Sequence, residues 1–377
     1  MAAAVLFSGF TAIGISTAFP DEIFIGEGER AEVKCPVPIR AERLCSSKNE
    51  CKIKLSLPSG AYVKTVSIKE VKKNYLIPAG IPFGIKMFTK GVVVVGLSDI
   101  DKNGRLLNPA KEAGIKCGDI ILEINNKNVS SNEDISKIIN TSQGRPMTVK
   151  LKSKGKEKTV SLVPLQSSDG FKAGMWVRDS SAGIGTMTYY DPVNNSFAGL
   201  GHPVCDADTG IILPIDRGKA VNVNITGVNK GRAGTPGELR GTFGHLIIGE
   251  LQTNKESGVF GKGENIKCEA KPIEAATKDK IHTGAAYILT TTEGNEPNAY
   301  KIEIERISCR EKNNSKNMII KITDEKLLEK TGGIVQGMSG SPILQDGRLV
   351  GAVTHVLVND PTRGYGIFIE NMLETEK

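Results

Sequence analysis

One six-residue segment near the C-terminus limits the possible folds of this chain more than any other. It is Gly337-Met338-Ser339-Gly340-Ser341-Pro342, which reads as a turn. Glycines on both sides of Ser339 allow a sharp backbone turn and let another backbone group approach closely. A serine hydroxyl is a weak nucleophile at neutral pH, so it needs a neighbouring base and donors for an oxyanion. The N–H groups of Gly337 and Ser339 are suitably spaced to be those donors. The segment therefore predicts a nucleophilic Ser339, and the alternative interpretation is a plain glycine-serine loop.

Two short apolar runs follow this turn. Residues 342–344 and 349–353 read as strands, and the pair Asp346-Gly347 between them favours a tight hairpin turn. The hexapeptide with its hairpin resembles the nucleophile segment of chymotrypsin-like serine peptidases. Earlier runs such as Val221-Asn222-Val223, separated by glycines, suit antiparallel barrels. We therefore expect a mainly β chain with a chymotrypsin-like double β-barrel peptidase domain at residues 170–377.

A serine peptidase of this kind needs an imidazole base, and the chain has only four histidines. His202 lies in a glycine-punctuated apolar segment, Phe197–His202, and it precedes the serine, as the resemblance requires. We predict His202 as the base. His245 also lies in a strand-like segment, His355 follows the nucleophile and could line the same cleft, and His282 looks like a surface residue.

The third group of such a site is an acid that holds the imidazole in the right tautomer. Five aspartates that lie between His202 and Ser339 are candidates, and spacing does not choose among them: Asp206, Asp208, Asp216, Asp279 and Asp324. Asp206 and Asp208 could instead form a turn, because they lie in the polar segment that ends at Gly210.

Residues 80–166 read as a separate α+β module. The run Ala113-Gly114-Ile115 followed by residues 118–125 (GDIILEIN) resembles a PDZ domain, the alternative being a small spacer. PDZ domains bind an extended peptide as an added strand, and loop N–H groups receive its C-terminal carboxylate. We predict Phe83, Gly84 and Ile85 as this peptide-binding loop. Pro82 removes one donor, which favours internal or weak ligands.

The N-terminal part is predicted to contain an anchor and a linker. Residues 1–20 are apolar after the initial methionine, and a helix of that length about spans a bilayer core, which predicts a transmembrane or signal anchor. Residues 21–79 hold four prolines and read as a strand-poor linker. The seven cysteines fit no standard zinc spacing, so no metal site is predicted; Cys45–Cys51 and Cys268–Cys309 are conceivable disulfides. The net charge of +7 is spread over short lysine clusters, which argues against nucleic acid binding.

The catalytic segments together resemble the stage IV sporulation protein B (SpoIVB) serine peptidase family. The segments that carry this resemblance are 331–343 around Ser339, 351–356 (GAVTHV), 358–361 (VNDP), 364–366 (GYG) and 197–202. It implies Ser339 as nucleophile, His202 as base and Asp324 as acid, with no cofactor. It also implies an enzyme anchored in the forespore inner membrane, with its body in the space between forespore and mother-cell membranes.

The resemblance further implies what this enzyme acts on. It would cleave itself, which releases the body, and then cut a membrane-bound regulator of an intramembrane metalloprotease, which leads to late sigma-factor activation. Two alternatives differ in class: a catalytically inactive PDZ scaffold, and a general envelope quality-control protease. The intact nucleophile turn argues against the scaffold, and a PDZ module placed before the catalytic domain argues against the quality-control enzyme.

Overall fold

The structure, a computed structural model, describes residues 22–26, 40–45, 51–71, 74–308 and 315–376. These residues divide into two compact units. The first unit runs to Tyr75 and includes Thr277–Ile281, which holds the short 3₁₀ helix η1 (Lys278–Lys280). The second comprises Leu76–Ala276 and His282 to the C-terminus.

The first unit is a four-stranded sheet, so the prediction of a strand-poor linker at residues 21–79 is wrong. Its strands, in the order β1-β4-β3-β2, are β1 (Glu22–Gly26), β4 (Tyr62–Val71), β3 (Cys51–Ser56) and β2 (Arg40–Cys45). Apolar and polar residues alternate along β3, and this alternation buries Ile53 and Leu55 on one face. Cys45 and Cys51 are register partners across β2 and β3. The predicted anchor, residues 1–20, lies outside the described residues, and none of the described helices is long and apolar enough to span a membrane.

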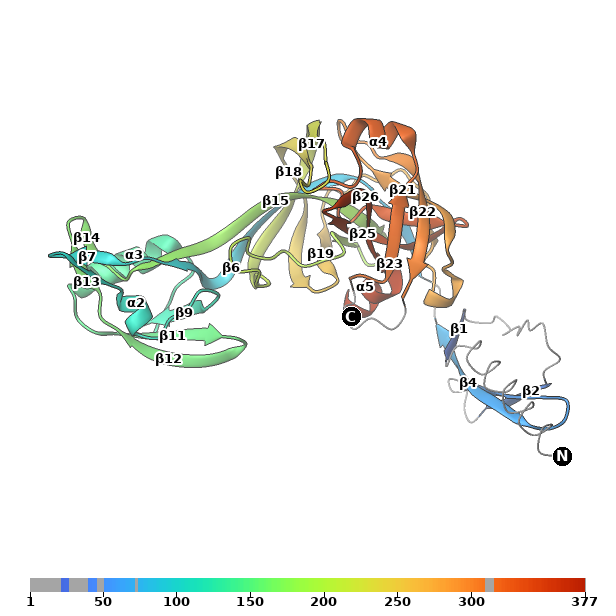
Figure 1. Cartoon of the computed structure of the whole chain (residues 1–377), viewed down its shortest axis with the longest axis horizontal. Coiled ribbons are helices and arrows are strands. Elements are labelled where there is room, and N and C mark those ends of the chain that lie inside the picture. Colours follow the sequence, from blue (N-terminus) through green and yellow to red (C-terminus); the bar gives the residue numbers. More distant parts are fainter. Residues whose placement is uncertain (1–21, 27–39, 46–50, 72–73, 309–314, 377) are drawn as a thin grey trace. The chain divides into compact units, whose positions relative to one another are not determined.

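A six-stranded ring forms the first barrel of the second unit (Figure 1). In ring order its strands are β6 (Pro82–Leu97), β17 (Ile215–Asn229), β18 (Glu238–Lys255), β19 (Gly258–Gly263), β16 (Ser196–Gly199) and β15 (Met175–Asp191). The ring closes because β15 also pairs with β6, from Thr186 opposite Pro82 to Met175 opposite Leu97. The short strands β5 (Tyr75–Pro78) and β20 (Ile273–Glu274) extend this sheet beyond β15.

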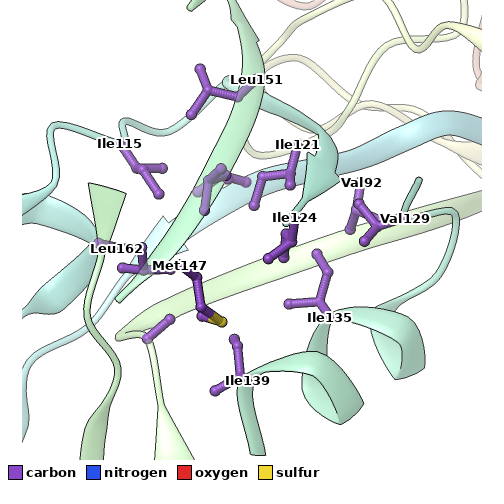
Figure 2. Packing of buried hydrophobic residues seen from close by; sticks show 14 residues of the cluster. Val92, Ile115, Ile121, Ile124, Val129, Ile135, Ile139, Met147, Leu151 and Leu162 are labelled. Atoms are coloured by element: carbon purple, nitrogen blue, oxygen red, sulfur yellow. The ribbon is translucent and has the colours of Figure 1, made fainter. Parts of the chain in front are cut away.

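The PDZ module is inserted into this barrel between β6 and β15, which corrects the predicted boundaries at residues 80 and 170. Its elements are β7 (Ile100–Lys102), β8 (Arg105–Leu107), α2 (Pro109–Glu112), β9 (Ile120–Ile124), β10 (Lys127–Asn128), α3 (Asn132–Ser142), β11 (Met147–Ser153), β12 (Lys156–Leu162), β13 (Leu165–Ser167) and β14 (Gly170–Lys172). Helix α3 begins at a capping box made by Ser131 and Asp134. Figure 2 shows Ile135 and Ile139 of this helix packing toward the buried side chains of the module's strands.

The second barrel is closed by six strands in the order β21-β22-β23-β26-β25-β24. They are β21 (Gly284–Thr290), β22 (Asn298–Ile307), β23 (Met318–Ile322), β26 (Asp360–Phe368), β25 (Arg348–Leu357) and β24 (Pro342–Gln345). Helix α4 (Glu325–Thr331) follows β23, and helix α5 (Ile369–Glu376) follows β26. The predicted hairpin is present: Asp346 and Gly347 both have positive φ, as a tight turn between β24 and β25 requires. Two β-barrels therefore make up the peptidase part, as the sequence predicts.

Candidate active site

The nucleophile turn is fixed to the first barrel by hydrogen bonds from β15. The amide of Thr186 donates to the Ser339 carbonyl at 2.9 Å, and its hydroxyl donates to the Gly337 carbonyl at 2.8 Å. The hydroxyl of Thr188 donates to the Gly340 carbonyl, also at 2.8 Å. Sequence reasoning missed both threonines, because no local pattern links residues about 150 positions apart. These bonds join the two barrels at the turn and hold Ser339 at their junction.

Glycine is required at position 340 of the turn. Gly340 has a φ of +94°, and a Cβ there would overlap the Thr186 carbonyl. Gly337 also has a positive φ, of +95°. Among the described residues, the amides of Gly337 and Ser339 donate no hydrogen bond to other backbone groups. Both predicted oxyanion donors are therefore available to a substrate carbonyl.

His202 and Ser339 line the same cavity, whose volume is about 580 Å³. A tight backbone turn at Leu200 and Gly201, both with positive φ, places the histidine there directly after β16. The His202 Nδ1 atom lies 2.8 Å from the Pro203 carbonyl oxygen. A carbonyl only accepts, so Nδ1 carries the proton and Nε2 remains free to take a proton from a serine hydroxyl. Burial lowers the pKa of this imidazole, which keeps it neutral and competent as a base.

A second imidazole, that of His355 on β25, borders the same cavity. The two rings lie with their centroids 4.8 Å apart, at a tilt of 39°. Burial, the neighbouring His202 and Lys316 together lower the pKa of His355 to about 4. His355 is therefore neutral at physiological pH and packs against the base without competing with it as a charge.

The structure does not bring Asp324 to the cavity that His202 and Ser339 line, so it does not support the predicted role of this residue as the acid of the site. Asp324 is the N-cap of α4, and its carboxylate accepts the amides of Lys326 and Leu327 at 3.1 and 3.2 Å. It also accepts the amide of Lys301 at 3.2 Å. A short polar side chain directly before a helix accepts hydrogen bonds from the helix's free amides. This capping role accounts for an aspartate at position 324. The Pro203 carbonyl occupies the place at His202 Nδ1 that an acid would take.

The other aspartate and histidine candidates from the sequence are bonded elsewhere or lie at the surface. Asp206 accepts the amides of Asp208 and Thr209, and Arg178 bonds both Asp206 and Asp208, so these aspartates form a turn, as the alternative interpretation has it. His282 lies at the surface and bonds Asp346 at 2.8 Å. His245 is exposed on β18. Among the described residues, no group of three His, Cys, Asp or Glu side chains is placed to hold a metal ion.

The predicted peptide-binding loop is also corrected. Phe83, Gly84 and Ile85 lie within β6, where β15 pairs on one side and β17 on the other. Phe83 and Ile85 are buried, and a side chain at position 84 would collide with the Phe243 ring. A strand with neighbours on both edges cannot accept a further peptide strand. The groove of the PDZ module lies elsewhere, beside α3, with a volume of about 620 Å³ and a lining that includes Ile135, Ile139 and Phe171.

Two fused β-barrels, with a serine, a neutral imidazole and two free amides at one cavity, define a serine peptidase that carries an inserted PDZ domain. The family model for the SpoIVB peptidase S55 matches residues 169–373, and a PDZ domain model matches residues 108–153. The chain belongs to the SpoIVB peptidase S55 family.

Similarity to individual proteins is more limited. A putative zinc metalloprotease of Clostridium acetobutylicum is 37% identical over 92 residues, which are 24% of this chain and 26% of that protein. A probable protease of Enterococcus faecalis, eep, is 32% identical over 95 residues, 24% of this chain and 22% of that protein. The chain thus spans about a quarter of the length of these curated relatives.

The Rv3671c protease of M. tuberculosis in its active form overlaps 52% of this chain and 72% of its own, with 12% identity and a TM-score of 0.33. The inactive form of the same protease gives a TM-score of 0.31, with 12% identity, 51% of this chain and 81% of its own.

Proposed function

We propose that this peptidase hydrolyses peptide bonds by acyl transfer, with Ser339 as nucleophile and His202 as its general base. Nε2 of His202 takes the hydroxyl proton as Ser339 attacks the peptide carbonyl, and the amides of Gly337 and Ser339 receive the oxyanion. The protonated imidazole then gives its proton to the leaving amine, and water releases the acyl-enzyme. The observation that carries this proposal is that the serine, the neutral imidazole and the two free amides meet at one cavity.

A fluorophosphonate probe and a protein substrate test these roles. Ser339→Ala should abolish labelling, and Ser339→Ala and His202→Ala should each lower the cleavage rate on the order of 10⁴-fold, because members of such a unit act together. His245→Ala is the matched control, since that imidazole is exposed and lies outside the cavity. Near-normal cleavage by His202→Ala would exclude His202 as the base and direct attention to His355.

The lining of the cavity supports a preference for uncharged side chains next to the cleaved bond. Among the described residues that line it, none is Asp, Glu, Lys or Arg, and the wall nearest the nucleophile turn includes Ile334, Val335 and Val356. A charge placed there would lose its hydration without an opposite charge nearby. Matched peptides that carry Val or Lys before the cleaved bond test this: the Val peptide should give the higher kcat/KM, and equal values would contradict the preference.

For the biological role we propose sporulation signalling, on the basis of the family. In this proposal the enzyme is anchored in the forespore inner membrane and acts between the forespore and mother-cell membranes. It cuts itself between the anchor and the PDZ module, then a membrane-bound regulator of an intramembrane metalloprotease, which leads to late sigma-factor activation. Because β2, β3 and β4 are paired strands, the self-cleavage site falls outside them.

Self-cleavage is tested with purified full-length protein and its Ser339→Ala form. N-terminal sequencing of the released body should give an end before Tyr75 that is absent from Ser339→Ala. An end within the PDZ module, or the same end from Ser339→Ala, would overturn this part of the proposal while leaving the chemistry at Ser339 intact.

A further inference from the structure

Strand β6 changes partners where the barrel meets the PDZ module. Upstream of the change it pairs with β17, as far as Thr89 opposite Ile215, and downstream it pairs with β9, from Val92 opposite Ile121. The facing strand β15 shifts register at the same level, between Arg178 and Ser180. The buried Thr89 hydroxyl lies 2.6 Å from the Gly91 carbonyl and 3.1 Å from that of Asp179, which holds the shifted backbone in place. Arg178 and Asp179 thus occupy the junction of the two folds.

Arg178 reaches from this junction to the loop that carries His202. Its guanidinium bonds the carboxylate of Asp206 and, at 2.7 Å, that of Asp208. The Asp206 side chain is fully buried, and it also accepts the amides of Asp208 and Thr209 at 3.1 and 2.8 Å. Burial by itself raises the pKa of Asp206, but the hydrogen bonds from Thr209 and Arg178 lower it overall, so the carboxylate stays charged. A buried carboxylate of this kind depends on its cation.

The adjacent Asp179 bonds the PDZ helix. Its carboxylate accepts the amide of Asn132, the first residue of α3, at 2.9 Å. The same helix carries Ile135 and Ile139, which line the groove beside it. Two consecutive residues of β15 therefore bind two different elements: Asp179 binds the start of α3, and Arg178 binds the loop that carries His202.

We propose that Arg178 and Asp179 are positioning residues that couple helix α3 of the PDZ module to the His202 loop. This rests on the proposed role of His202 as the base. A peptide segment that binds in the groove and shifts α3 would displace Asp179 through its bond to Asn132. The adjacent Arg178 would shift with it and would displace Asp206, which lies four residues after His202. When the Asp179–Asn132 and Arg178–Asp206 bonds are both formed, His202 is held in place. Loss of either bond allows the His202 loop to move.

Hydrogen exchange in the full-length protein tests the link without reference to activity. Asp179→Ala should speed exchange of the amides of Asp208 and Thr209 by roughly ten- to a hundredfold, as expected for loss of a charge-assisted bond. Asp134→Ala is the matched control, because the Asp134 carboxylate also accepts amides at the start of α3, but those bonds, from Ser130 and Ser131, stay within the PDZ module. It should loosen α3 and leave the His202 loop unchanged. Exchange that rises only in α3 for both variants would overturn the coupling.

Kinetics with a short peptide substrate test the positioning role. Asp179→Ala and Arg178→Ala should lower kcat several-fold with little change in KM, and Arg178→Lys should restore part of the loss because it keeps the positive charge. If Arg178→Ala does not fold, Arg178→Lys and Asp179→Ala still decide the question. Loosening the loop should also shift the acid limb of kcat/KM to higher pH, because a more hydrated His202 regains its ordinary pKa.

The other titratable groups at His202 are His355 and Cys205 in the same cavity, with Lys316 acting on His355. They are unchanged in all three variants. Replacing Arg178 also removes a bond that lowers the pKa of Asp206, so the acid limb of Asp179→Ala, which keeps both Arg178 and Asp206, is the one that reports on the base. Unaltered kcat and an unaltered pH profile in Asp179→Ala would overturn the proposal. Failure of Ser339→Ala or His202→Ala to lose activity would instead overturn the proposed function itself.

Discussion

At the scale of single residues, the site depends on a backbone carbonyl in a place where a side-chain acid was expected. The Pro203 carbonyl holds His202 Nδ1 at 2.8 Å and so fixes the tautomer in which Nε2 can accept a proton. A carbonyl stabilises the imidazolium less than a carboxylate does, because it carries no full charge. Burial lowers the pKa of His202 by more than the bond to the Pro203 carbonyl raises it.

The pH profile should show this lowered pKa. In the proposed mechanism catalysis needs neutral His202, so the acid limb of kcat/KM should lie below pH 6.5, the ordinary pKa of histidine. Stability follows with the same sign: the unfolded chain takes up a proton near pH 6.5 and the native imidazole does not, so the free energy of unfolding should fall as the pH drops below 6.5. A pH–rate profile with its acid midpoint above 6.5 would contradict this.

A second residue-scale prediction concerns Gly340. A methyl group there would overlap the Thr186 carbonyl and come within 2.5 Å of the Leu200 amide. The backbone at φ +94° is also unfavourable for alanine, by about 1–2 kcal/mol. Gly340→Ala should therefore lower both the midpoint of thermal unfolding and the rate of labelling at Ser339. Gly347→Ala is the control: it is also a positive-φ glycine, but it has open space around it, so it should cost stability while sparing labelling.

At the scale of secondary structure elements, the start of helix α4 accounts for Asp324 as a helix cap. Asp324 bonds the backbone amides of Lys326, Leu327 and Lys301, which ties the helix start to β22. The family resemblance implies Asp324 as the acid of the site, but the helix start uses its carboxylate.

The capping role predicts how substitutions at Asp324 behave. Asparagine is an equally good N-cap, so Asp324→Asn should keep both the stability and the cleavage rate near wild type. Asp324→Ala should lower the free energy of unfolding by about 1 kcal/mol. Denaturant unfolding and peptide hydrolysis measure the two effects, and a rate loss of roughly 10³-fold or more in a stable Asp324→Asn protein would restore the acid role.

At the scale of the whole molecule, the PDZ domain is an insertion within the first barrel rather than a domain ahead of it. Strand β6 contributes buried side chains to both: Phe83, Ile85 and Met87 to the barrel, Val92 and Val94 to the PDZ module. The barrel therefore needs chain from both sides of the insertion to close.

Truncations test this organisation. A protein that begins at Leu76 keeps all six strands of the first barrel and should unfold cooperatively and label with a fluorophosphonate probe. A protein of residues 170–377 lacks β6, which exposes the edges of β15 and β17, and it should fail to fold. Cooperative unfolding and labelling of the shorter protein would show that the barrel closes without β6.

The local features of this protein can be predicted from short stretches of its sequence. Four such features depend on residues close together in the chain, whose backbone preferences act over a few positions. They are the nucleophile turn, the Asp346-Gly347 hairpin, the glycine-flanked His202 and the PDZ-like segment of residues 113–125. The sequence did not reveal the N-terminal sheet, because the four prolines of residues 21–79 favoured a linker, and the pairing of β1 with β4 joins segments about 40 residues apart.

The remaining features could be recognised only in the folded chain. Four features depend on pairings between distant segments: the place of Phe83–Ile85 in a barrel, the bond of Asp324 to β22, the threonines that hold the nucleophile turn, and the junction at Arg178 and Asp179. Such pairings are set by how whole strands share neighbours and bury their faces, and a strand such as β6 carries no local mark of which sheet it joins.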